Sequence, residues 1–231
     1  MQLIFKCPPE LLGVVPRPSL AKEGLPTWLK EMPSEAYNML VNNVDDTVKR
    51  CPPFIDALAC GFVIPLLCDL HVENGTMHWG EGIPGTESAS FPRSPVTIHD
   101  PSQLAGTPYF DADVFPIKFN NVWSIRAPEG YALLFTHPLN RLDLPFVTLT
   151  GLIDSDVFFD TPVHFPAIWR DLEFSGTIRA GTPIAQVIPF KREQWSAAHE
   201  ALSADDLARR RHLISRMTRR RGVYRRHFRK S

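Results

Sequence analysis

The sequence predicts a mostly-β protein with short N-terminal helices and a helical, basic C-terminal tail. All 22 prolines of the 231-residue chain lie between Pro8 and Pro189, and prolines at this density interrupt long helices. Short apolar runs separated by turn residues fill the same region, which is typical of strands. The remaining, proline-free end is rich in arginine and has apolar residues at near-helical spacing.

Two short helices are expected in the N-terminal part. The string "PTWLKEMP" (26–33) predicts a helix closed by Pro33, and "PPFIDALACG" (52–61) predicts one ending at Gly61. The rest of residues 1–61 is expected to wrap irregularly around the protein. Strands are predicted at residues 62–72, 115–127, 131–137, 146–154, 174–180 and 183–190. These boundaries divide the chain into an N-terminal wrap (1–61), a core domain (62–192) and a helical, arginine-rich segment (193–231).

The C-terminal segment separates the charges of the chain. Residues 209–231 hold 11 of the 25 Lys and Arg residues and none of the 25 acidic ones, although the net charge of the whole chain is zero. Ser203, followed by Asp205 and Asp206, predicts the start of a helix, and Gly222 predicts its end. Such a segment is expected to bind nucleic acid or another polyanion, or to fold back on the acidic body of the protein.

Bulk properties predict a cytoplasmic protein without a membrane segment. No apolar run reaches the roughly 18 residues that a membrane-spanning helix needs, and the first residues do not resemble a signal peptide. The four cysteines show neither a CxxC pair nor the spacing of a zinc site. We therefore expect reduced thiols, some of them buried as small apolar side chains.

One predicted hairpin carries residues that are suited to binding a metal. Asn74-Gly75 favours a two-residue turn, because both turn positions need a positive φ and asparagine and glycine adopt one readily. Pairing outward from the turn places His71 opposite His78, with Glu73 on the same face. Two histidines and one carboxylate suit a divalent metal, the one cofactor that the sequence suggests, but a half-exposed hairpin shows the same pattern without any metal.

The string "GLIDSDVFFD" (151–160) places three carboxylates, Asp154, Asp156 and Asp160, among apolar residues that predict a buried strand. A buried carboxylate is destabilising by several kcal/mol unless it is paired or hydrogen-bonded. These aspartates therefore either hold a ligand or accept backbone hydrogen bonds in a turn.

Three strings, in their order and spacing, resemble motifs of the β-clip fold of trimeric dUTPases and dCTP deaminases. They are "APEGYALLF" (127–135), "TGLIDSD" (150–156) and "IRAGTPIAQVI" (178–188). Over most of its length the chain also resembles a family of tailed-phage and bacterial proteins, through "LPTWLKEMP", "TVKRCPPFIDAL", "LNR…GLIDSD" and "GTPIAQVIPFKR". That family has no activity to carry over. These resemblances imply a β-clip-like core and a homo-oligomer, with a trimer favoured.

The resemblance to dUTPases also implies roles for single residues. Asp154 would hold a sugar hydroxyl and activate water, Asp156 would support the turn, and Gln186 would organise a subunit contact or a base pocket. The sequence departs from these enzymes at Val157, where they have a tyrosine, and at His164, where dCTP deaminases have their catalytic glutamate. It also lacks the glycine-rich arm that closes over the phosphates. We therefore expect neither dUTPase nor dCTP deaminase activity.

Three functions remain open, and the sequence leaves open whether the protein is an enzyme. The first is binding or processing of a nucleotide-like small molecule in a remodelled cleft. Its catalytic residues would be Asp154 and His164, and its ligand contacts would be His137, Arg141, Asp156 and Gln186. The second is a non-catalytic, phage-type assembly or nucleic-acid-associated protein. The third is a non-haem metal enzyme built on His71, Glu73 and His78.

Overall fold

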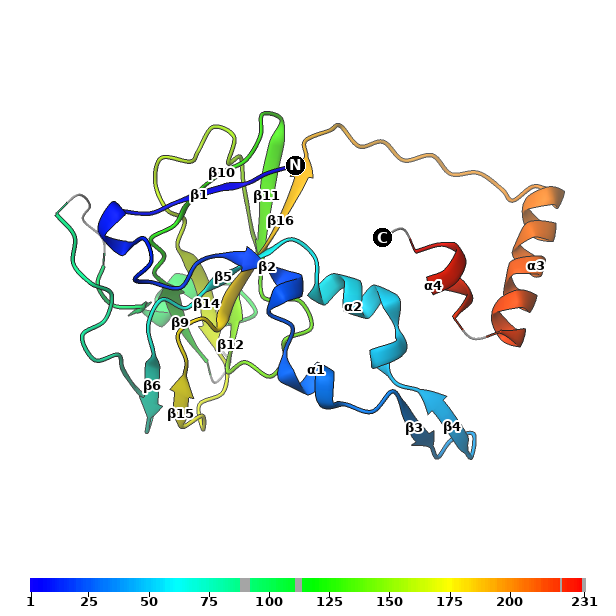
Figure 1. Ribbon diagram of the computed structural model, residues 1–231, viewed down its shortest axis with the longest axis horizontal. Helices are drawn as coiled ribbons and strands as arrows, with labels where there is room; N and C mark the ends of the chain where they lie inside the picture. Colours follow the sequence, from blue (N-terminus) through cyan, green and yellow to red (C-terminus); the bar gives the residue numbers. More distant parts are fainter. Residues whose placement is uncertain (88–91, 111–113, 221, 230–231) are drawn as a thin grey trace. The chain divides into compact units, whose positions relative to one another are not determined.

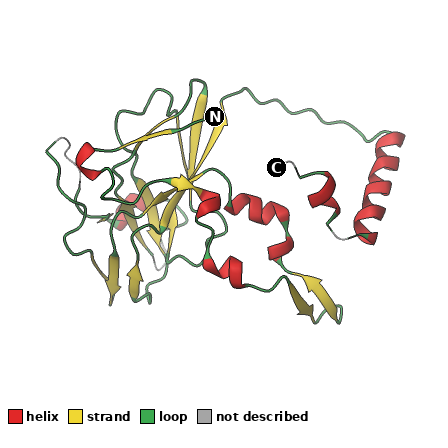
Figure 2. Cartoon of the chain, viewed as in Figure 1, coloured by secondary structure: helices red, strands yellow, loops and turns green. Residues whose placement is uncertain are grey.

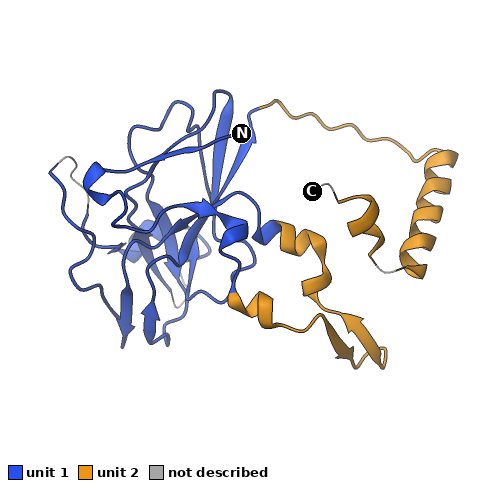
Figure 3. Cartoon of the chain, in the orientation of Figure 1, with its two compact units in different colours: residues 1–26, 57–192 blue, residues 27–56, 193–231 orange. Residues whose placement is uncertain are grey.

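The computed structural model describes residues 1–87, 92–110, 114–220 and 222–229, and the chain divides into two units (Figure 3). Unit 1 comprises residues 1–26 and 57–192, and unit 2 comprises residues 27–56 and 193–231. The N-terminal 61 residues, which we expected to form one wrap, are thus shared between the units. Strands make up 29% of the chain and helices 21%, so the predicted mostly-β class is confirmed.

Unit 1 consists of antiparallel sheets connected by loops and short 3-10 helices (Figures 1 and 2). The five-stranded sheet has the order β13-β11-β16-β5-β2 and contains β2 (Ser19–Leu20), β5 (Phe62–Pro65), β11 (Tyr131–Thr136), β13 (Gly151–Ile153) and β16 (Pro183–Lys191). The four-stranded sheet has the order β12-β14-β9-β8 and contains β8 (Val96–Ile98), β9 (Phe115–Phe119), β12 (Phe146–Thr148) and β14 (Phe165–Trp169).

Two smaller sheets and three 3-10 helices complete unit 1. One sheet, of order β15-β6-β7, joins β6 (Leu70–Glu73), β7 (Thr76–His78) and β15 (Gly176–Ile178). The other pairs β1 (Ile4–Lys6) with β10 (Ser124–Arg126). The 3-10 helices are η1 (Pro9–Leu11), η2 (Ala21–Glu23) and η4 (Pro101–Leu104).

The main core of unit 1 contains side chains from all four sheets. Four consecutive residues of β16, Ile184–Val187, are buried, as expected for a central strand that is covered on both faces. The Phe119 and Phe146 rings pack edge to face with their centroids 4.6 Å apart. A smaller cluster is centred on the buried Trp123, whose indole Nε1 donates to the Pro16 carbonyl at 3.1 Å.

Three apolar runs that we predicted as single strands are each divided between two sheets. Residues 62–72 contribute β5 and β6, residues 115–127 contribute β9 and β10, and residues 146–154 contribute β12 and β13. At the first break, the Leu66 amide donates to the Thr182 carbonyl at 2.8 Å. Each half places at least one apolar side chain against the core, so the hydrophobic pattern continues across the corner and hides the break.

The predicted β6–β7 hairpin is confirmed. His71 pairs with His78, Val72 with Met77 and Glu73 with Thr76. The turn residues Asn74 and Gly75 have φ values of 49° and 73°, the positive values that this turn requires. Val72 and Met77 are buried, while the histidine face is exposed.

Unit 2 contains the short elements of residues 27–56 and the C-terminal helices. Its elements are α1 (Thr27–Glu31), β3 (Glu35–Asn38), β4 (Asn43–Asp46), η3 (Val48–Arg50), α2 (Pro52–Leu58, which extends into unit 1), α3 (Ala204–Arg219) and α4 (Val223–His227). Both predicted N-terminal helices are therefore present. Lys49 Nζ donates to the Lys30 and Met32 carbonyls at 2.7 and 2.8 Å, which satisfies free carbonyl groups at the end of α1.

The C-terminal segment begins its helix as predicted but ends it earlier. Residues 193–202 have no regular structure, and Ser203 and Asp206 then form a capping box at the start of α3. The helix ends at Arg219, and Gly222, with φ 73°, precedes the separate helix α4. In the part of the chain that the structure describes, no helix has the length and apolar character needed to cross a membrane.

Candidate functional site

The two aspartates of "GLIDSD" lie just after β13 and differ sharply in exposure. The side chain of Asp154 is 54% exposed, whereas that of Asp156 is 5% exposed. The Asp154 carbonyl accepts the amides of Val157 and Phe158 at 3.1 and 2.8 Å, so its main chain forms the turn. The buried Asp156 carboxylate is therefore the one that needs partners from the fold.

Arg192, the last residue of unit 1, binds both carboxylates. Its Nη1 lies 2.9 Å from Asp154 Oδ1, and its Nη2 pairs with Asp156 Oδ2. The Gly130 amide donates to the same Asp156 oxygen at 2.9 Å, and the Gly130 carbonyl accepts the Arg192 amide at 2.8 Å. Arg192 thus connects the end of β16 to the turn after β13 and to the turn at Gly130. Asp154 has an ion-pair partner as well as its place in the turn.

The His137 ring is hydrogen-bonded through both nitrogens. The Thr148 amide donates to Nδ1 at 3.3 Å, which assigns the lone pair to Nδ1 and the proton to Nε2. Nε2 then donates to the Arg141 carbonyl at 2.9 Å. Burial lowers the pKa of His137, so the neutral form is favoured. This ring joins the loop after β11 to β12 and has both nitrogens occupied.

Arg141 is engaged within its own loop. Its Nε lies 2.8 Å from Asp143 Oδ1, and its Nη2 lies 2.8 Å from Asp143 Oδ2. This two-point geometry is the strong form of an arginine–carboxylate pair. An anionic ligand would have to compete with Asp143 for the guanidinium.

His164 belongs to a network that shapes the segment between β9 and β10. The Asn121 amide donates to His164 Nδ1 at 3.1 Å. The Asn121 side chain, itself buried, donates to the Trp123 and Val163 carbonyls at 2.8 and 3.1 Å and accepts the Trp123 amide at 3.0 Å. Burial and, to a smaller degree, the charge of Lys118 lower the pKa of His164. The Nδ1 atom of His164 therefore already accepts a hydrogen bond from the main chain.

Gln186 is buried in β16, and its contacts lie within the chain. Its Oε1 accepts the Leu139 amide at 2.8 Å. Its Nε2 donates to the Ala57 and Cys60 carbonyls at 2.9 and 2.6 Å. The side chain therefore connects the end of α2 to the loop that carries His137 and Arg141.

These residues form separate groups. Leu133 pairs with Ile153 and Phe135 with Gly151, so Asp154 lies beside the start of β11, whereas His137 follows its last residue. Five residues of extended strand span roughly 17 Å. The structure thus brings Asp154 together with Asp156, and His137 with Arg141, but it does not bring the two groups into one cleft.

The histidine face of the β6–β7 hairpin is exposed, and one of its histidines has a partner on a neighbouring strand. His71 Nδ1 lies 2.8 Å from Thr177 Oγ1 on the neighbouring strand β15. Among the residues that the structure describes, no three His, Cys, Asp or Glu side chains come close enough together to hold a metal ion. The predicted register, with His71 opposite His78, is confirmed, and a metal site made from His71, Glu73 and His78 stays a prediction.

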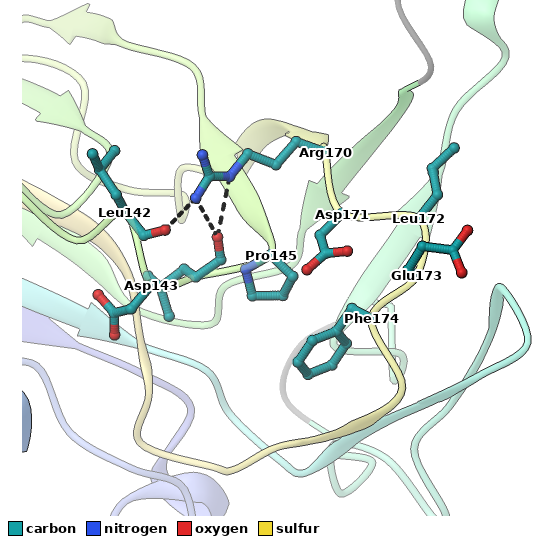
Figure 4. A pocket seen from close by; sticks show the side chains of 9 residues that line it. Leu142, Asp143, Pro145, Arg170, Asp171, Leu172, Glu173 and Phe174 are labelled. Atoms are coloured by element: carbon teal, nitrogen blue, oxygen red, sulfur yellow. Dashed lines mark hydrogen bonds between the residues drawn. The ribbon is translucent and has the colours of Figure 1, made fainter.

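A groove of about 520 Å³ lies between the loops 142–145 and 170–174 (Figure 4). Asp143, Asp171 and Glu173 supply carboxylates to its lining, and Arg170 supplies a guanidinium. Arg170 Nη2 pairs with the Leu142 carbonyl and donates to the Leu144 carbonyl at 3.0 Å (Figure 4). Asp143 is paired with Arg141, and the remaining carboxylates of Asp171 and Glu173 outnumber the one guanidinium of the lining, so the groove favours a cationic group over a phosphate.

The basic residues of α3 and α4 contrast with those of unit 1. In α3, the residues at positions 209, 212, 216 and 219 are Arg, His, Arg and Arg, a spacing that places them on one helical face. We call them the basic face. Arg209 pairs with Asp206, and just after α4 Arg229 pairs with Asp56. Arg216 and Arg219 have no ion-pair partner among the described residues.

Sequence reasoning missed the residues that organise unit 1. Arg192 ends the string "GTPIAQVIPFKR" and was itself assigned no role, yet it binds both aspartates. Asn121 falls inside a run that was predicted as one continuous strand. A buried asparagine next to another, Asn120, in the middle of a predicted strand was the available signal, because such side chains need hydrogen-bond partners and favour a break in the strand.

Comparison of the chain with models of protein families finds no match, and neither curated proteins nor solved structures give one. The resemblances to dUTPases and to the phage family therefore stay predictions. Function has to be inferred from the chain's own residues.

Proposed function

We propose that the protein binds a nucleic acid, or a polyanion of similar charge density, through the basic face of α3 and the arginines around it. The observation that carries this proposal is that residues 209–231 contain 11 basic residues and no acidic one. Binding of Lys and Arg to phosphates releases condensed counterions and supplies most of the sequence-independent affinity for nucleic acids.

The geometry of the segment supports this choice. No residue of α3 is buried, so its arginine side chains are not needed for a core. Helix α3 starts at a capping box, which keeps a 16-residue helix regular and the basic face aligned. The extended residues 193–202 precede it and provide reach along a polymer.

The alternative of a nucleotide-sized ligand in unit 1 has less support. Asp154, Asp156 and Arg141 each have an ionic partner in the fold. The groove beside Arg170 has a lining in which carboxylates outnumber guanidinium groups. A phosphate-bearing small molecule would meet repulsion there, whereas α3 offers positive charge on an exposed helix.

The test is a salt titration of binding to a fluorescent duplex DNA, using the full chain. Arg216→Gln with Arg219→Gln should weaken binding and reduce the slope of log K against log salt by about one for each arginine that no longer neutralises a phosphate. The matched control, Lys6→Gln with Lys22→Gln, removes the same charge from exposed positions of unit 1 and should leave the slope unchanged. Equal effects of the two double variants would refute a site on α3.

A further inference from the structure

The β3–β4 hairpin of unit 2 ends in an exposed apolar tip. Met39, Leu40 and Val41 are 86%, 95% and 61% exposed, in a loop position where polar residues are usual. On the strands below, Tyr37 pairs with Val44, and both side chains are exposed. Directly paired residues lie on the same face of a hairpin, so these two continue the apolar surface of the tip.

Asparagines fix this conformation. The Asn38 side chain accepts the Leu40 amide at 3.0 Å, and Asn42 adopts a φ of 50°, a value that asparagine tolerates better than most residues. The Tyr37 hydroxyl donates to the Asn42 side chain. The polar residues are thus used to build the turn, and the apolar ones are presented outward.

A second exposed apolar surface lies on α3. The residues at positions 207, 210, 214 and 217 repeat the spacing of the basic face but start two residues earlier, which places them on nearly the opposite side of the helix. Leu207, Ile214 and Met217 are 43%, 54% and 53% exposed. Arg210 lies among them. We call these four residues the apolar face of α3.

The two surfaces are complementary in charge. On the hairpin, Glu35 pairs with Asp46 across the strands, on the same face as Tyr37 and Val44. Two acids directly opposite each other repel, and Arg50 bridges them at 2.8 and 2.9 Å. Arg210 of the apolar face has no ion-pair partner among the described residues. Glu35, Asp46 and Arg50 together carry a net charge of −1, so the apolar hairpin face has a weakly acidic base that complements an apolar helix face with a central arginine.

We propose that the apolar face of α3 docks on the β3–β4 hairpin of a second copy of this chain. Within one chain both surfaces stay exposed, although Arg229 and Asp56 join the tail to residues 27–56. A contact between the apolar face of α3 in one copy and the hairpin of another covers both surfaces. When the same contact repeats around a ring or across a twofold axis, the assembly is closed. The basic face points the other way and stays available, so this inference goes beyond polyanion binding and does not rest on it.

The decisive experiment is a disulfide trap between two differently labelled chains. Both carry Cys51→Ser and Cys60→Ser, which remove the exposed cysteines. One chain carries Leu40→Cys and the other Ile214→Cys. We expect a disulfide joining the two labels when the chains are mixed, and none when Leu152→Cys, an apolar position of unit 1 that is 60% exposed, replaces Leu40→Cys. With both cysteines in one chain, a bond formed only within monomers would overturn the proposal.

Light scattering provides the second measurement. The unmodified chain should have an oligomeric mass at micromolar concentration, and Met39→Ser with Leu40→Ser should shift it to the monomer mass. Leu152→Ser should leave it unchanged. Arg216→Gln with Arg219→Gln should keep the oligomer while weakening DNA binding, which separates this proposal from the proposed function. A monomeric wild-type chain, or a tip variant that assembles like wild type, would contradict the docking.

Discussion

Three arginines of unit 1 and two arginines on the basic face of α3 in unit 2 are used in opposite ways. In unit 1, Arg192 binds Asp154 and Asp156, Arg141 binds Asp143, and Arg170 binds main-chain carbonyls. In unit 2, Arg216 and Arg219 project from a helix that buries no residue. A polar residue next to an apolar strand must be paired for the strand to form, whereas a charge on an exposed helix need not be. Unpaired charge therefore indicates an external partner better than a carboxylate in an apolar string does.

The largest effect on stability is expected when a buried polar residue of unit 1, Gln186, is replaced. Gln186→Ala removes the partner of the Leu139 amide and of the Cys60 carbonyl, whereas the Ala57 carbonyl still accepts the Cys60 amide at 3.3 Å. At about 1–3 kcal/mol for each unsatisfied group, we expect a loss of about 3 kcal/mol in the free energy of unfolding. Urea denaturation measures it. Gln194→Ala, in the exposed linker, is the control and should have no measurable effect.

A smaller loss of unfolding free energy is expected when the ion pairs of Arg192 with the buried Asp156 and the exposed Asp154 are changed. Arg192→Gln leaves the buried Asp156 charge without its ionic partner and should destabilise unit 1 by about 2 kcal/mol, since the arginine is itself partly exposed. Asp154→Asn removes the exposed pair and should have an effect of less than about 1 kcal/mol. Equal losses in the two variants would show that burial does not set the difference.

The two partly buried histidines of unit 1 should make its stability depend on pH. Burial lowers the pKa of His137 and of His164 below the ordinary value of 6.5. The unfolded chain therefore takes up protons first, and stability is complete above pH 6.5 and is lost as pH falls toward the folded-state pKa. His137→Gln should flatten this part of the curve of unfolding free energy against pH. His199→Gln, in the exposed linker, should leave the curve unchanged.

The smallest effect on stability is expected on α3. Arg216→Gln with Arg219→Gln should change the free energy of unfolding by no more than about 0.5 kcal/mol, because the two side chains have no ion-pair partners among the described residues. Calorimetry of the full chain tests this. A destabilisation like that of Gln186→Ala would mean that the basic face supports the fold and is not reserved for a ligand.

Local chemistry allowed the start of several elements to be predicted. Ser203 and Asp206 begin α3, and Asn74-Gly75 set the register of the β6–β7 hairpin, because caps and tight turns depend on neighbouring residues alone. The ends of strands were predicted less well. Whether the run 115–127 stays in one sheet depends on Asn121, whose partners Val163 and His164 lie far along the chain.

The mostly-β class, the separation of charge between body and tail, and the alternation of faces in the hairpin could all be predicted from the residues alone, since they follow from composition and periodicity. Which polar residues meet depends on how the strands pair. Asp154 and His137 are 17 residues apart in sequence but lie at opposite ends of β11, while Arg192 reaches both Asp154 and Asp156. Strand pairing joins distant segments, and no local pattern records which of their side chains come into contact.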